Sequence, residues 1–301
     1  MKAMNSELTQ MKGEAVLRSL GETIEAWLRD GIDWSGLPEH LSEATQYGVL
    51  GGGKRLRPAL VLLSCRSVGG DQHLALPAAG ALELAHCFSL VHDDLPALDN
   101  DLLRRNRPTL HVHAGEAMAI LAGDLKLTMA FAELARAELP DHERTMLVQE
   151  LAKGTSDMVV GQVYDTLGGL PETLSSLEQV QLVHRNKTGA LIRCACRMGA
   201  ICGNATDEHL EALTMYGQAM GLMFQIVDDL LDVTQTADHV GKATGKDQES
   251  GKLTYPLVLG EEACRQEIDH LLTESLQAIT PLGQAGDPLA SLAQFMAVRT
   301  R

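Results

Sequence analysis

Four carboxylates and two arginines lie within one short stretch of the chain, 88–105, which reads FSLVHDDLPALDNDLLRR. The carboxylates are Asp93, Asp94, Asp99 and Asp101, and Arg104 and Arg105 follow them. Closely placed carboxylates repel one another, and a hard divalent cation such as Mg²⁺ relieves that repulsion through oxygen ligands. The adjacent arginines favour an anion beside the metal. The stretch therefore predicts a site for a metal ion and a phosphate group.

A second acidic cluster occupies residues 224–232, FQIVDDLLD. Asp228 and Asp232 are four residues apart and Gln225 is three before Asp228, so all three share one face of a helix. Two acidic helices that face each other could hold a metal–diphosphate between them.

A glycine-rich segment near residue 50 supplies a further phosphate candidate. Residues 48–54 match GxxxxGK, but Arg55 follows where a Walker motif has Ser or Thr, and no strand precedes it, which argues against an NTPase. Lys54 and Arg57 are expected on one face of a helix's first turn, where backbone N–H groups favour anions. A basic surface loop is the alternative interpretation.

Two other features have a functional and a plain interpretation. The loop over residues 238–256, DHVGKATGKDQESGKLTYP, carries Lys242, Lys246 and Lys252, and is either a lid over phosphate or a solvated linker. His86 shares a helical stripe with Asp93 and is either a site residue or a hydrogen-bonded core histidine.

Helical periodicity dominates the elements that must position these residues. Helices are expected over 6–30, 38–49, 58–69, 73–94, 114–137, from Asp141 as N-cap to about 165, and over 174–202, 207–235 and 256–301. Pro96 restricts Leu95, so a helix should end near Asp93–Asp94 and Asp99 should fold back toward that end. No segment has the period of a strand, and the prediction is an all-α fold.

Composition narrows the function. The 301 residues are 45% apolar but only 3% aromatic, and the formal charge of −15 argues against general affinity for nucleic acid or anionic membranes. The six cysteines form no CxxC pair and are expected to be buried, reduced thiols in a reducing cytoplasm. No apolar signal core and no apolar run of roughly 20 residues is present, so a soluble, cytoplasmic protein without a membrane span is expected.

With both acidic clusters in view, the chain resembles the short-chain trans-prenyltransferases (polyprenyl synthases), most closely the bacterial farnesyl diphosphate synthases (geranyltranstransferases). Six segments carry the resemblance in the family's order: GGGKRLRP at 51–58, HDDLPALDNDLLRR at 92–105, GQVYD at 161–165, HRNKTGALIR at 184–193, FQIVDDLLD at 224–232 and GKLTYP at 251–256. The resemblance implies one domain over 1–301, an all-α isoprenoid-synthase-type bundle of antiparallel helices around a central cavity, and a homodimer.

The resemblance also implies roles for individual residues. Metal ligands would be Asp93, Asp94, Asp99, Asp228 and Asp232 with Asp229 supporting, and they would hold Mg²⁺, as three ions, or Mn²⁺ in its place. Isopentenyl diphosphate would be held by Lys54, Arg57, His86 and Arg105, and the allylic diphosphate by Arg104, Lys187, Thr188, Gln225, Lys242 and Lys252. The catalytic group would be Asp93, Asp99, Asp228, Lys187 and Lys242. Two residues depart from the family pattern: Leu102 stands where many relatives have another Asp, which removes a charge, and Asn106 stands where they have Gly, which is mild because Asn tolerates a left-handed turn.

Residues just before the first acidic cluster bear on product length. Ser89 lies about 6 Å down the helix from Asp93 on nearly the same face, and Phe88 is the next residue back. An aromatic residue here, together with the two-residue spacing in DDLPALD, resembles the enzymes of the family that stop at farnesyl diphosphate, C15. Phe88 as ordinary core filling is the alternative.

Other functions fit less well. Geranyl or geranylgeranyl diphosphate synthesis stays open within the family. A class I terpene cyclase generally has a different second motif and an aromatic-lined cavity. A catalytically silent prenyltransferase subunit tends to lose an Asp-rich motif. A Ca²⁺-binding loop at 99–101 fails the EF-hand pattern.

Overall fold

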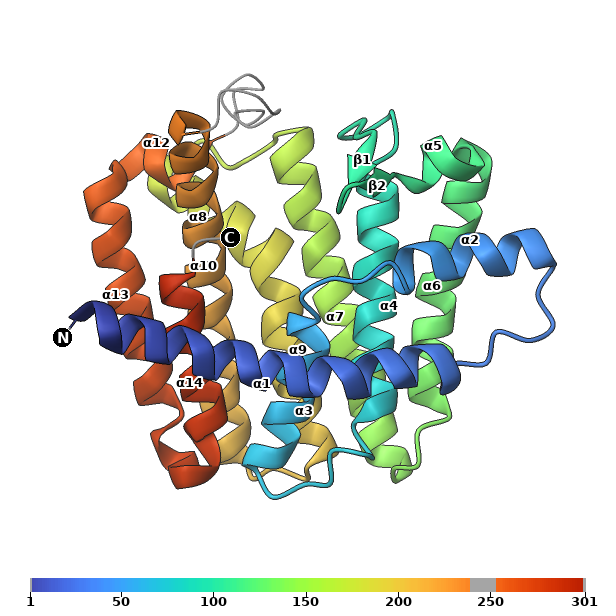
Figure 1. The fold of residues 1–301 in the computed structure, drawn as a ribbon, viewed down its shortest axis with the longest axis horizontal. Helices are drawn as coiled ribbons and strands as arrows, with labels where there is room; N and C mark the ends of the chain where they lie inside the picture. Colours follow the sequence, from blue (N-terminus) through green and yellow to red (C-terminus); the bar gives the residue numbers. More distant parts are fainter. Residues whose placement is uncertain (1, 239–252, 300–301) are drawn as a thin grey trace. The chain divides into compact units, whose positions relative to one another are not determined.

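The computed structural model of the chain describes residues 2–238 and 253–299, and its elements are almost all helices (Figure 1). The prediction of an all-α fold is confirmed. The chain forms two compact units. We call residues 17–152 with 198–204 the Asp93 unit, and residues 1–16, 153–197 and 205–301 the Asp228 unit.

The Asp93 unit is built around the apolar helix that carries the first acidic cluster. Its elements are α2 (Glu39–Val49), α3 (Leu56–Ser67), α4 (Leu76–Asp93), β1 (Leu103–Arg104), β2 (Arg107–Pro108), α5 (Leu110–Ala114) and α6 (Glu116–Ala135). Helix α4 packs against α3 and α6, and α6 packs in turn against α2 and α5 (Figure 1). Leu82 and Leu84 of α4 are completely buried, as expected for a helix that is apolar on every side.

The Asp228 unit is organised around the long helix of the second acidic cluster. Its elements are α8 (Ser176–His184), the π-helical turn η1 (Arg185–Gly189), α10 (Asp207–Asp238), α12 (Tyr255–Leu259), α13 (Glu261–Ala278), η2 (Thr280–Gly286) and α14 (Asp287–Val298). Helix α10 contacts α8, η1, α12, α13 and α14. Helices α1 (Lys2–Asp30), α7 (Asp141–Thr166) and α9 (Ala190–Cys202) contribute residues to both units.

Four details of the predicted elements are corrected by the structure. The short antiparallel pair β1–β2 was not expected, because two residues a strand are too few to show a period. The predicted helix over 114–137 forms as α6 but begins only at Glu116, because Gly115, whose φ is 86°, separates it from α5. Asp141 is the first helical residue and not the N-cap. The predicted helix over 174–202 does form, with Ser175 and Glu178 as a capping box, but it contains the π turn η1.

The prediction that the cysteines are buried is confirmed. All six cysteines are buried thiols without a disulfide. Burial raises the pKa of Cys65 to about 11 and that of Cys87 to about 12. Within the described residues, no helix is both long and apolar enough to cross a membrane.

Candidate active site

The first acidic cluster sits where α4 ends. Helix α4 stops at Asp93, and the backbone N–H of Asp99 donates to the carbonyl oxygen of Asp93 at 2.9 Å. The loop after Pro96 therefore folds back toward the helix end, as the sequence predicts. This brings the backbone of Asp99 beside that of Asp93 and places both acids at one end of the helix.

Asp94 faces inward and is paired with an arginine. The residue is 3% exposed; the one N–H of Arg104 Nε is shared between its two oxygens, at 2.9 Å from each, and Arg104 Nη2 donates to Oδ1 at 2.6 Å. Burial raises the pKa of Asp94, although Arg104 acts in the opposite direction. Asp94 was predicted to bind the metal and Arg104 to bind the allylic diphosphate. In this structure the two side chains bind each other.

A tight hairpin presents the two arginines of the motif. Strands β1 and β2 pair Leu103 with Pro108 and Arg104 with Arg107. The turn residues Arg105 and Asn106 both have positive φ, 53° and 60°, as a type I′ turn requires. Asn106 is therefore well suited to its position, which agrees with the prediction that its departure from the family pattern is mild.

Arg105 lies over the glycine-rich segment. Its Nη1 donates to the carbonyl oxygen of Gly52. A Cβ on Gly53, whose φ is 135°, would come within 2.6 Å of the Arg105 Cζ atom. Glycine at this position therefore lets the guanidinium approach the backbone.

His86 and Arg57 form the other side of this basic group. Arg57 Nη1 and His86 Nε2 are 3.2 Å apart. Burial and then the charges of Arg57, Arg105 and other arginines lower the pKa of His86 well below its usual value, so its ring is neutral. Since a guanidinium can only donate, Nε2 of His86 is the acceptor. The two residues are locked in one arrangement by this contact.

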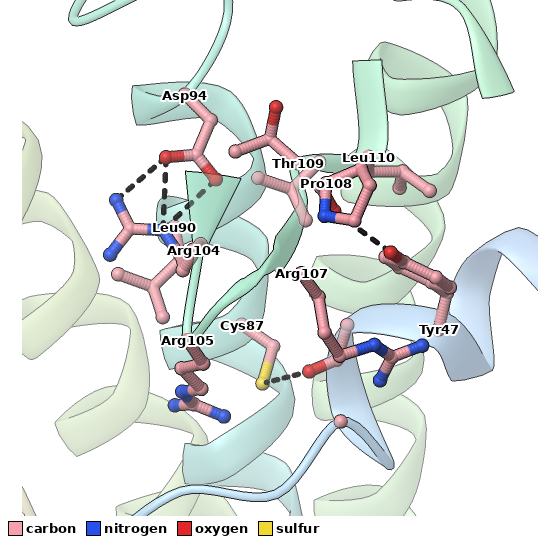
Figure 2. A pocket seen from close by; sticks show the side chains of 13 residues that line it. Tyr47, Cys87, Leu90, Asp94, Arg104, Arg105, Arg107, Pro108, Thr109 and Leu110 are labelled. Atoms are coloured by element: carbon pink, nitrogen blue, oxygen red, sulfur yellow. Dashed lines mark hydrogen bonds and ion pairs between the residues drawn. The ribbon is translucent and has the colours of Figure 1, made fainter. Parts of the chain in front are cut away.

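Three of the four residues predicted to hold isopentenyl diphosphate therefore belong to one electropositive region, namely Arg57, His86 and Arg105. Lys54 is exposed in the loop before α3, because the helix begins only at Leu56; its predicted place in the first helical turn is wrong. A pocket of about 50 Å³ adjoins this region, with Asp94, Arg104, Arg105 and Arg107 in its wall (Figure 2).

The sequence did not reveal the residues that hold this region in place. Arg55, buried and with φ of 49°, donates to Glu25 at 2.6 Å, to Glu83 at 2.5 Å and to the Val49 carbonyl oxygen at 2.5 Å, and so anchors the glycine-rich segment. Positive φ at an arginine leaves no signal in the sequence.

Contacts of Tyr47 also hold the hairpin in place. The Arg107 Cζ atom lies 4.2 Å from the centroid of the Tyr47 ring, and Tyr47 stacks on His113 with centroids 4.3 Å apart. The Tyr47 hydroxyl donates to the Pro108 carbonyl oxygen at 2.8 Å (Figure 2). These contacts fix β2 and therefore the arginines next to it.

The second acidic cluster lies on α10. The Asp228 side chain is 38% exposed, Asp232 is exposed, and Arg299 Nη2 donates to Asp228 Oδ1. Arg299 also donates to the Phe224 carbonyl oxygen at 3.1 Å, and its Cζ lies 4.1 Å from the Phe224 ring centroid. Arg299, at the end of the described chain, thus packs against α10. The sequence did not predict this contact, because the two segments are about 70 residues apart.

The π turn places the predicted allylic-diphosphate residues beside α10. Lys187 Nζ lies 2.6 Å from Asp165 Oδ2, and the Thr188 hydroxyl donates to Gln225 Oε1 at 2.7 Å. Lys187, Thr188 and Gln225 are therefore brought together within the Asp228 unit. Lys242 and Lys252, predicted for the same role, lie outside the described residues.

The chain's own carboxylates fit a hard cation but do not enclose one. Among the described residues, no three His, Cys, Asp or Glu side chains converge on a point that could hold a metal. Asp93, Asp99, Asp228 and Asp232 supply only oxygen donors, the type that Mg²⁺ prefers, and Mg²⁺ is commonly held by one or two carboxylates with substrate phosphates completing its shell. The donor set therefore fits a metal that binds together with a diphosphate.

The two residues assigned to product length are half-buried on α4. The Phe88 ring meets the His92 ring edge-on with centroids 4.8 Å apart, and the Ser89 hydroxyl donates to the His86 carbonyl oxygen at 2.9 Å. Their role in product length stays a prediction.

Comparison with known proteins gives a consistent result. The family described as polyprenyl synthetase matches residues 38–282. Geranylgeranyl pyrophosphate synthase 11, chloroplastic, of Arabidopsis thaliana is 44% identical over 271 residues, covering 87% of this chain and 75% of the relative. The heterodimeric geranylgeranyl pyrophosphate synthase large subunit 2 of the same plant is 39% identical over 96% of this chain and 76% of its own.

Solved structures resemble the chain over nearly its whole length. An FPP/GFPP synthase from Zymomonas mobilis has a TM-score of 0.83 at 31% identity, covering 96% of this chain and 99% of that one. A geranyltransferase from Legionella pneumophila has a TM-score of 0.83 at 30% identity, covering 96% and 98%.

Proposed function

The chain belongs to the polyprenyl synthetase family and is a trans-prenyltransferase, and we propose that it condenses isopentenyl diphosphate with dimethylallyl or geranyl diphosphate. The observation that carries this proposal is the basic region formed by Arg57, His86 and Arg105 next to the first acidic cluster. Because His86 is neutral, the positive charge of this region comes from Arg57 and Arg105, although the chain as a whole carries −15. Such a region suits a diphosphate.

In the proposed reaction the allylic C–O bond breaks, and its electron pair leaves with the diphosphate oxygen. The double bond of isopentenyl diphosphate then attacks the allylic carbon, and a proton is lost to the released diphosphate. Bound Mg²⁺ would stabilise the negative charge that builds up on the leaving group. Asp93, Asp94, Asp99, Asp228 and Asp232 are the proposed ligands, for three ions, with Mn²⁺ as a substitute.

The basic residues divide between the two substrates. Lys54, Arg57, His86 and Arg105 hold isopentenyl diphosphate in this proposal. Arg104, Lys187, Thr188, Gln225, Lys242 and Lys252 hold the allylic diphosphate. Arg104 then acts from its pair with Asp94, which fixes the guanidinium in place. Lys187, paired with Asp165, gives a fixed positive charge beside Thr188 and Gln225.

Farnesyl diphosphate, C15, is the proposed product, because Phe88 narrows the path one residue beyond Ser89. A second candidate is geranylgeranyl diphosphate, C20, which the names of the Arabidopsis relatives favour. The similar solved structures, an FPP/GFPP synthase and a geranyltransferase, point to more than one product length among relatives.

One domain over residues 1–301, a homodimer and a cytoplasmic location complete the proposal. Heterodimeric and chloroplastic relatives give the alternatives for the last two. Size-exclusion chromatography with light scattering distinguishes a dimer of the 32.4 kDa chain from a monomer.

Incubation of the purified chain with Mg²⁺, labelled isopentenyl diphosphate and, separately, each allylic diphosphate tests the proposal. We expect label in a C15 alcohol after dephosphorylation. A C20 product would favour the second candidate, and a cyclic hydrocarbon made from the allylic substrate alone would identify a cyclase. No product with any allylic substrate would contradict the proposal and favour a silent subunit.

A further inference from the structure

Asp229 is the one acid of the second cluster that points into the protein. It is 5% exposed, whereas the Asp228 side chain is 38% exposed and Asp232 is exposed. Successive residues on a helix are turned by about 100°, so Asp229 cannot share the face of Asp228 and Asp232. Its carboxylate must therefore serve a different purpose from theirs.

Both oxygens of Asp229 accept hydrogen bonds from the Asp228 unit. Gln225 Nε2 donates to Oδ1 at 2.9 Å, and the backbone N–H of Tyr255 donates to Oδ2 at 3.0 Å. Tyr255 is the first residue of α12, and the N-cap Thr254 makes no side-chain capping bond. Asp229 thus satisfies an N–H group that would otherwise lack an intrahelical partner.

His184 does not neutralise this carboxylate. Its Nε2 lies 3.9 Å from Asp229 Oδ2, which is too long for a hydrogen bond. Burial lowers the pKa of His184 to about 4, so the ring is uncharged at neutral pH. The charge on Asp229 is accordingly stabilised by donors such as the Gln225 amide and the Tyr255 N–H.

A hydrogen-bonded chain links Asp229 to the residues proposed to bind the allylic diphosphate. The Thr188 hydroxyl donates to Gln225 Oε1 at 2.7 Å, while Gln225 Nε2 donates to Asp229. A carboxylate can only accept, so Asp229 determines which end of the Gln225 amide faces it. With the Gln225 amide in this orientation, the Thr188 hydroxyl donates its proton to Gln225 Oε1. The second N–H of Gln225 Nε2 is then available to an anion.

We infer that Asp229 is a positioning residue and not a metal ligand: it sets the orientation of the Gln225 amide and the Thr188 hydroxyl and joins α12 to α10. The link to the allylic diphosphate rests on the proposed function. The hydrogen-bonded chain itself does not depend on it, and the two can be tested separately.

Thermal unfolding in EDTA tests the chain without substrate or metal. Asp229→Asn turns an N–H group toward the Gln225 amide, which must turn over and reverse its hydrogen bond with Thr188, and Gln225→Glu puts two carboxylates together, so each should lower Tm by about 2–5 °C. The double variant Q225E/D229N exchanges the amide and the carboxylate at constant net charge. All three hydrogen bonds can then form again, with Asp229→Asn supplying the donor to position 225, and Tm should return to within about 1 °C of the original protein.

A ligand role makes the opposite prediction. Removing one charge from a group of mutually repelling carboxylates would leave Tm in EDTA unchanged or raise it. The inference would be overturned if Asp229→Asn left Tm in EDTA unchanged or raised it. It would also be overturned if the Tm loss of the double variant equalled the sum of the losses of the two single variants.

Steady-state kinetics separates positioning from general stabilisation. Asp229→Asn should raise KM for the allylic diphosphate by about tenfold, the effect of one misplaced hydrogen bond to a charged group, and leave KM for isopentenyl diphosphate within about twofold. If Asp229→Asn lowers Tm but leaves both KM values as they are in the original protein, Asp229 is a purely structural residue and the positioning role is contradicted. A chain with no activity would contradict the proposed function, while the Tm cycle would still decide the hydrogen-bonded chain.

Discussion

Lys126 is a lysine in the interior of the Asp93 unit. Its side chain is completely buried on α6, and its ammonium lies 3.4 Å from the Ala122 carbonyl oxygen. Burial lowers its pKa from 10.5 to about 8, against a small opposite effect of Cys87. Folding must therefore bury a charge at neutral pH, and a lowered pKa of this size corresponds to a penalty of about 3 kcal/mol.

The replacement Lys126→Met should stabilise the protein. Below about pH 8 the lysine is charged in both states and the penalty is complete. Between pH 8 and 10.5 only the unfolded state is protonated, so the penalty shrinks as pH rises, and it vanishes above 10.5. We expect the free energy of unfolding to rise by about 1–3 kcal/mol at pH 7 and little at pH 10, measured by urea titration.

The exposed Lys12 on α1 provides the control, because Lys12→Met should change stability little at either pH. If Lys126→Met raised the free energy of unfolding by the same amount at both pH values, the effect would come from the shape of the side chain and not from its charge.

Product length is also decided by single residues. Ser89→Phe should block growth one turn below Asp93 and enrich geranyl diphosphate, and Phe88→Ala should deepen the path and enrich geranylgeranyl diphosphate. Chromatography of the dephosphorylated products measures both. If both variants keep the product length of the original protein, the floor of the cavity lies elsewhere.

At the scale of elements, close contact between α7 and the π turn fixes Lys187. A Cβ on Gly161 of α7 would come within 2.2 Å of the backbone nitrogen of Lys187, and backbone cannot move aside as a flexible side chain can. Gly161→Ala should therefore displace η1 and raise KM for the allylic diphosphate by about tenfold or more, with a Tm loss of several degrees.

Gly21→Ala on α1 is the matched control, because nothing lies within 4 Å of its Cβ. It should leave kinetics unchanged and leave Tm equal or slightly higher, since alanine favours helix. Normal allylic KM in Gly161→Ala would mean that η1 can move without loss of the site.

The sequence predicted the elements well where apolar periodicity is strong. The helices that carry Asp93 and Asp228 and the fold-back of Asp99 follow from periodicity and from Pro96. The β1–β2 hairpin and the π turn η1 could not be predicted, because each depends on local backbone geometry that side-chain type barely determines.

The site was predicted by residue type more than by contact. Arg57, His86 and Arg105 do belong to one region, and so do Lys187, Thr188 and Gln225. Pairing within the site was not foreseen: Arg104 with Asp94 and Arg299 with Asp228. The sequence shows which charged residues are present, but only the folded structure shows which of them form ion pairs with one another.

At the scale of the whole molecule, the account requires two diphosphate sites in an acidic protein. Arg105→Gln should raise KM for isopentenyl diphosphate by about tenfold and leave the allylic KM within about twofold, and Lys187→Gln should do the reverse. Initial rates with one substrate varied at a time provide the measurement.

Arg18→Gln, at an exposed arginine of α1, controls for the loss of one positive charge and should change neither KM. Equal increases in both KM values for each site variant would contradict the two-site assignment while leaving the reaction class intact.

The central claim is that the two acidic clusters act through a divalent metal on a prenyl transfer. It is tested most directly by the rate at which Asp93→Ala and Asp228→Ala convert labelled isopentenyl diphosphate, compared with the unaltered chain in Mg²⁺. We expect each substitution to lower kcat by at least about 10²-fold, the scale of losing one preorganised electrostatic contact, and EDTA to abolish the residual rate until excess Mg²⁺ is added. Near-normal turnover by both variants, with folding verified by Tm, would contradict the account.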